Sequence, residues 1–152
     1  MTQQSSDFEF LYGQWQVRHR RLKERLVGCQ DWEAFRSVSR VYGLMGGLTN
    51  VDESQRSDGR WVGMSIRLFE PLSKQWSIYW VGPDGALQPP VMGRFEDGVG
   101  TFYGDEESAT GRLRCRFVWS QIGTAHPRWE QALSLDDGQS WETNWIMEHT
   151  RL

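Results

Sequence analysis

Apolar and polar residues alternate with a period of two along most of this chain, and turn-forming residues interrupt the alternation at short intervals. This pattern is typical of strands with one buried face, and it predicts an all-β fold. Asp58-Gly59 and Asp137-Gly138 supply the positive φ angles that tight hairpins require. One short helical turn near residues 7–12 is the only helix expected. The expected strands cover residues 13–26, 33–44, 48–54, 60–69, 75–82, 91–96, 99–104, 112–121, 128–135 and 140–151.

The two ends of the expected sheet carry features that fit each other. Gly13-x-Trp15 begins the first strand, and Arg151 ends the last one. Ten strands in an open sheet would leave two exposed edges, which full closure removes. We therefore expect a single antiparallel ten-stranded β-barrel over residues 1–152, with residues 1–10 disordered or forming a short cap. We expect Trp15 to pair with Arg151, whose guanidinium would stack on the indole and close one end of the barrel.

Composition and charge exclude several classes of partner. A net charge of −3 and the lack of a long basic run give no reason to expect nucleic acid. The first ten residues lack the basic and apolar regions of a signal peptide, and no stretch approaches the ~18 apolar residues of a membrane span. We therefore expect a cytoplasmic protein with no membrane partner, in which Cys29 and Cys115 are reduced thiols. No cofactor is indicated, and a homodimer stays an open alternative.

The aromatic content of the chain is high, with nine Trp, seven Phe and four Tyr. Such side chains suit a tightly filled core and a lined cavity equally well. The function that we expect is the binding of a small apolar or amphipathic ligand inside the barrel, with a few polar anchors and no need for catalysis. The candidate ligand-binding residues are Trp15, His19, Arg67, Trp80, Glu130, Asn144, Trp145, His149 and Arg151.

Two alternatives follow from particular side chains. If Trp15 pairs with Arg151, His19 and His149 become diagonal neighbours on one face, where they could bind haem iron or another metal. Alternatively, Glu130 and His19 could act as acid and base on a small molecule. The enzyme hypothesis places Glu130 across a hairpin from Asn144, and it requires Glu130 and His19 to converge on one cavity.

Several segments of the chain resemble a family of bacterial proteins known as domain of unknown function 1579, over about nine tenths of the chain. The Gly13-x-Trp15 start and the terminal Arg151 are similar to the signature of the wider calycin superfamily. This resemblance implies a lipocalin-like barrel without a settled activity. A more distant similarity to nitrobindin-type haem barrels, which have a histidine ligand near the C-terminus, implies a role in haem binding for His149 alone. The segments that carry the closer resemblance are residues 17–23, 46–53, 67–71, 128–132 and 141–145.

Overall fold

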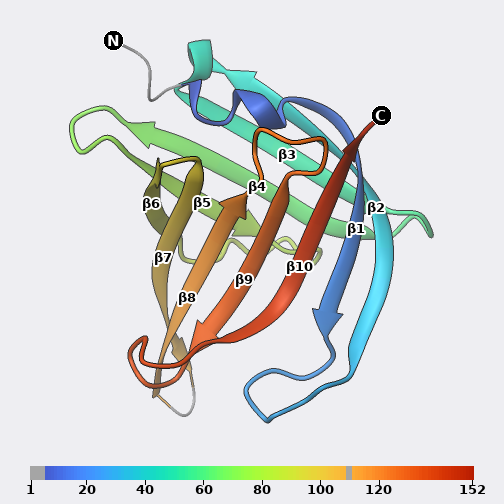
Figure 1. Ribbon diagram of the computed structural model, residues 1–152, viewed down its shortest axis with the longest axis vertical. Helices are drawn as coiled ribbons and strands as arrows, with labels where there is room; N and C mark the ends of the chain where they lie inside the picture. Colours follow the sequence, from blue (N-terminus) through green and yellow to red (C-terminus); the bar gives the residue numbers. More distant parts are fainter. Residues whose placement is uncertain (1–5, 109–110) are drawn as a thin grey trace.

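A computed structural model describes residues 6–108 and 111–152 as one closed β-barrel, in which each of ten antiparallel strands pairs with its sequence neighbours and β1 pairs with β10 (Figure 1). The expected all-β, ten-stranded barrel is confirmed. The strands are β1 (Gly13–Leu22), β2 (Trp32–Leu44), β3 (Thr49–Arg56), β4 (Trp61–Glu70), β5 (Gln75–Val81), β6 (Val91–Glu96), β7 (Val99–Ser108), β8 (Gly111–Ser120), β9 (Arg128–Ser134) and β10 (Glu142–Arg151).

The pairing of β1 with β10 has the register that the sequence predicts. Trp15 lies opposite Arg151, Val17 opposite His149, and His19 opposite Met147. The first strand is shorter than expected and ends at Leu22, because the chain then turns through a loop in which Leu26 has a φ of 61°. A leucine in the left-handed region cannot continue a strand.

One end of the barrel is closed by the short 3-10 helix η2 (Glu9–Leu11), which lies near the end of β10 in Figure 1. The indole Nε1 of Trp15 donates a hydrogen bond to the carbonyl of Leu11 at 2.7 Å. The Arg151 guanidinium lies 4.0 Å from the centre of the Trp15 ring and donates to the carbonyls of Tyr12 (2.7 Å) and Phe10 (3.0 Å). The expected stacking is confirmed, and the same pair also fixes the cap.

Aromatic side chains fill the space beneath this cap. Phe8 is fully buried and makes edge contacts with Trp76 and Phe95, at centroid distances of 4.9 Å and 5.0 Å. The Trp76 indole donates to Asp7 at 3.0 Å, which satisfies its N–H at the barrel end. The part of the barrel beneath the cap is therefore a filled core.

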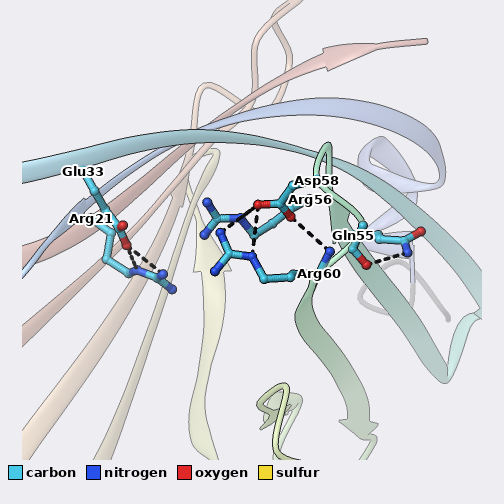
Figure 2. A network of polar contacts seen from close by, with 7 residues as sticks. Arg21, Glu33, Gln55, Arg56, Asp58 and Arg60 are labelled. Carbon is cyan, nitrogen blue, oxygen red and sulfur yellow. Dashed lines mark hydrogen bonds and ion pairs between the residues drawn. The ribbon is translucent and has the colours of Figure 1, made fainter.

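The opposite end carries the loops between β1 and β2, β3 and β4, β5 and β6, and β9 and β10 (Figure 1). Ion pairs fix the rim between β1, β2 and the β3–β4 hairpin (Figure 2). Arg21 donates to Glu33 at 2.8 Å, and Asp58 lies between Arg60 (2.7 Å) and Arg56 (3.5 Å). The arginines at this rim are thus already matched by carboxylates.

The outer wall over β2 to β5 is apolar. Tyr42, Val51, Ile66 and Tyr79 form one cross-strand row there, and Leu68 is 43% exposed in the next row. These side chains point away from the interior and do not line it. Within the described residues, no helix is both long and apolar enough to cross a membrane.

Gly13 allows the closure of the barrel, because its φ is 116° and an added Cβ would lie 2.8 Å from Nη1 of Arg151. We expect Gly13→Ala to lower the free energy of unfolding by roughly 1–3 kcal/mol through backbone strain and displacement of Arg151. Urea unfolding followed by tryptophan fluorescence measures this effect. Gly123→Ala is the matched control, since its Cβ would meet nothing within 4 Å. An equal loss of unfolding free energy in the two variants would contradict the role of Gly13 in closing the barrel.

Candidate functional site in the barrel interior

The inward-facing side chains leave two adjoining spaces. The inner cavity lies towards the closed end and has a volume of about 50 Å³. The outer pocket lies at the open end and has a volume of about 390 Å³. Five side chains, those of Ile78, Trp80, Phe117, Gln131 and Trp145, contact both spaces and form the border between them.

The inner cavity has indole walls and a polar side formed by β3 and β4. Arg67 is 3% exposed, forms a short ion pair with Asp52, and donates from Nη1 to Oδ1 of Asn50 at 2.7 Å. Asp52 also accepts the backbone N–H of Ser65 at 2.9 Å. A buried guanidinium is tolerated only when a carboxylate compensates its charge, and Asp52 provides this compensation.

Some buried polar atoms next to this ion pair have no partner among residues 6–108 and 111–152. They include Nε of Arg67 and Nδ2 of Asn50. An unpaired buried N–H group costs about 1–3 kcal/mol, so such groups are uncommon unless water or a ligand satisfies them. Of these two residues, Arg67 lines the inner cavity, so the cavity wall contains a hydrogen-bond donor that the folded chain leaves unused.

His149 brings an acceptor to the same cavity. Its Nδ1 lies 3.1 Å from the carbonyl of Pro127, which can only accept, so Nδ1 carries the proton and Nε2 holds a lone pair. Burial lowers the pKa of His149 to about 4, an effect that the hydrogen bond to Pro127 partly opposes. The ring is packed against Trp15 and Trp119, with centroids 5.8 Å and 5.3 Å away. At neutral pH it is an uncharged acceptor.

His19 has a different role, because the fold uses both of its ring nitrogens. Nδ1 accepts a hydrogen bond from the indole of Trp145 at 3.1 Å, and Nε2 therefore carries the proton that bonds Ser37 at 2.7 Å. The ring also stacks on Phe35 at 4.3 Å. Burial lowers the pKa of His19 to about 3, with a further contribution from His149. His19 thus holds Trp145 at the border between the two spaces.

The outer pocket holds a buried thiol. Cys115 is 4% exposed, and burial raises its pKa to about 12, with a further contribution from the Glu106 carboxylate. Thiolates and not thiols are nucleophiles, so Cys115 serves as apolar lining at neutral pH. Arg25, Asp84 and Glu106 also line this pocket and bring charges of both signs to it.

The structure brings together only some of the nine candidate residues. Arg67, Trp80, Trp145 and His149 line the interior spaces. His19 supports Trp145 from behind, as described above. The remaining candidates lie elsewhere: Trp15 and Arg151 form the closure, Asn144 reaches the cavity only through its hydrogen bond from Gln131, and Glu130 is on the outer wall.

The placement of Glu130 corrects the expected hairpin register. Asn144 forms a β-bulge, so Glu130 lies opposite Ile146 and Gln131 lies opposite Trp145. Glu130 points outward and pairs with Arg128 at 3.2 Å, while His19 points inward. Glu130 and His19 therefore do not converge on one cavity, which was the condition for the acid–base hypothesis.

The geometry also limits a histidine metal centre. His19 and His149 are diagonal neighbours as expected, yet both nitrogens of His19 already have protein partners. In the described part of the chain, no group of three or more His, Cys, Asp or Glu side chains is arranged to hold a metal ion. His149 alone keeps a nitrogen that could act as a ligand, and about 50 Å³ beside it is far too small for a porphyrin ring.

Several lining residues were outside the candidate set, including Ser39, Ser65, Cys115 and Phe117. Side-chain parity could have found them, because Ser65 shares a face with Arg67, and Ser39 pairs with Trp15 on the inward face. Comparison with models of protein families gives no match to this chain, and comparison with curated proteins gives none either. The closed barrel is consistent with a calycin-like fold, and no family match supports a narrower assignment.

The two buried histidines make stability depend on pH. Their pKa values in the folded chain, about 3 for His19 and about 4 for His149, lie below the ordinary 6.5, so between these limits the unfolded chain binds more protons. We expect the free energy of unfolding to fall as the pH drops from about 6.5 to about 4, by up to roughly 1.4 kcal/mol per pH unit for each histidine. Urea unfolding at several pH values measures the slope.

Variants separate this effect from the titration of carboxylates. His19→Gln removes one of the two groups, so its slope between pH 6.5 and 4 should be about half that of the wild type, whatever its stability at neutral pH. His126→Gln is the matched control, because His126 is exposed in the folded chain. If the free energy of unfolding of His19→Gln depended on pH as steeply as that of the wild type, His19 would not be buried in its neutral form.

Proposed function

We propose that this barrel binds one small amphipathic molecule, with its apolar body in the outer pocket and its polar end in the inner cavity. The observation that carries the proposal is that the two spaces adjoin and share lining residues, among them Trp80, Phe117 and Trp145. A pocket of about 390 Å³ lies within the range of ~300–1,000 Å³ typical of ligand sites. Apolar walls with a few convergent polar groups are the usual composition of such sites.

The protein's contribution to binding would be desolvation and orientation. Burial of apolar ligand surface contributes roughly 25 cal/mol per Å², and Trp80, Trp145 and Phe117 offer wide surfaces for it. The unpaired Nε of Arg67, a residue of the cavity wall, would then gain a partner, which favours ligands with a polar end over plain hydrocarbons. No bond needs to be made or broken for this function.

Titration with the neutral fluorescent probe N-phenyl-1-naphthylamine tests whether the outer pocket accepts an apolar body. We expect saturable binding to the wild type and a loss of at least about tenfold in affinity for Cys115→Phe, whose ring would occupy the pocket. Val118→Phe is the matched control, since Val118 lies on the same strand but on the outer wall. Thermal unfolding of each variant shows whether it is folded.

Two outcomes would contradict the proposal: no saturable binding to the wild type, or equal binding by wild type and folded Cys115→Phe. Native mass spectrometry of the protein purified from its own organism is an independent measurement. A retained small molecule would be released by Cys115→Phe and kept by Val118→Phe. Retention by both variants would place the molecule outside the outer pocket.

A further inference from the structure

We infer that the ligand's polar end is uncharged and both donates and accepts hydrogen bonds, as a hydroxyl or primary amide does, and that it sits between Arg67 and His149 in the inner cavity. This inference rests on the proposed function and narrows the class of ligand. Its support is the charge balance, the set of unused hydrogen-bonding atoms and the volume of the cavity.

The charges in the inner cavity already cancel one another. Arg67 contributes one positive charge, and its ion pair with Asp52 cancels that charge. His149 is uncharged at neutral pH because burial lowers its pKa to about 4, and the proton of the neutral ring lies on Nδ1, which donates to Pro127. A carboxylate or ammonium group entering this space would lose its hydration without finding a free counter-ion, which costs several kcal/mol. A neutral group does not meet this penalty.

The unused hydrogen-bonding atoms are of both kinds. Nε of Arg67 can only donate, and it has no partner among the described residues. Nε2 of neutral His149 can only accept, and likewise no described residue donates to it. A ligand group that satisfies both atoms must accept from one and donate to the other. Ethers and hydrocarbons fail this condition, whereas alcohols and primary amides meet it.

The volume restricts what can enter. A cavity of about 50 Å³ is one third of the ~150 Å³ that accommodates a benzene ring in an engineered protein cavity. It has room for a few water molecules or for one small polar group, but not for a ring. The apolar part of the ligand must therefore remain beyond Trp80 and Trp145, in the outer pocket.

The entrance does not favour a charged ligand either. Arg21 is paired with Glu33, and Arg56 and Arg60 share Asp58 (Figure 2). Arg25, Asp84 and Glu106 line the outer pocket, so these four arginines are balanced by four carboxylates. The rim thus carries charges of both signs and produces no strong electrostatic potential of one sign. Electrostatic attraction of an anion or a cation into the barrel is therefore weak. The neutrality inferred for the inner cavity extends to the rim.

A series of octyl compounds that differ only in the polar end tests this inference. 1-Octanol, octanamide, octanoate and octylammonium would each compete with N-phenyl-1-naphthylamine at pH 7. We expect the alcohol and the amide to bind at least about tenfold more tightly than the carboxylate and the ammonium compound. A preference for either ion, or equal affinities, would overturn the inference while leaving the proposed function standing. If neither the probe nor any octyl compound binds, the proposed function itself fails.

Asp52→Asn gives the sharper test, because it removes the counter-charge of Arg67 with almost no change of shape. The variant should shift the preference towards octanoate by at least about tenfold, since Arg67 is then a free cation in a dry cavity. Glu53→Gln is the matched control: it removes the same charge from the next residue of β3, which points outward, and should keep the preference for octanol. An unchanged preference in folded Asp52→Asn would overturn the inference. If this variant does not fold, the ranking in the wild type decides.

Discussion

The antiparallel pairing of β1 with β10 is the constraint on which the rest of the structure depends. It removes both sheet edges, and it brings Trp15 and Arg151 together at the end where the chain starts and stops. Arg151 then holds the carbonyls of Phe10 and Tyr12, so the closing strand also fixes the cap. Because the same register sets which side chains of β1 and β10 point inward, it also places His149 in the cavity wall and His19 behind Trp145.

The packing of side chains divides the interior into regions with different roles. Towards the cap, Phe8, Trp76 and their neighbours leave no usable space, and this part supplies stability. Towards the mouth, large indoles meet across a wider section and leave the outer pocket. The inner cavity lies between these regions and holds the Arg67–Asp52 pair together with donors that lack partners. A sequence selected for stability alone would place apolar residues there, since buried ion pairs rarely add stability over well-packed apolar groups.

Much of the fold could be predicted from the sequence, because period-two alternation and the paired ends define a barrel with little dependence on detail. The inward positions of β1 followed from one assumed pair, Trp15 with Arg151. The expected pairing of Glu130 with Asn144 was wrong by two residues, since Glu130 lies opposite Ile146. The bulge at Asn144 accounts for one of the two, and an ideal alternation contains no sign of it. The split into two spaces could not be predicted, because cavity volume depends on how the indoles of Trp80, Trp119, Trp129 and Trp145 pack in three dimensions.

Trp145 links stability to access. Its indole lines both spaces, makes edge contacts with Trp80 and Trp129, and donates to His19, which is itself bonded to Ser37. Trp80 and Trp145 both line the border between the outer pocket and the inner cavity. Motion of Trp145 breaks a buried hydrogen bond and leaves Nδ1 of His19 unpaired, whereas Trp80 has no such tie among the described residues. This buried hydrogen bond therefore fixes Trp145 at the border in a way that Trp80 lacks among the described residues.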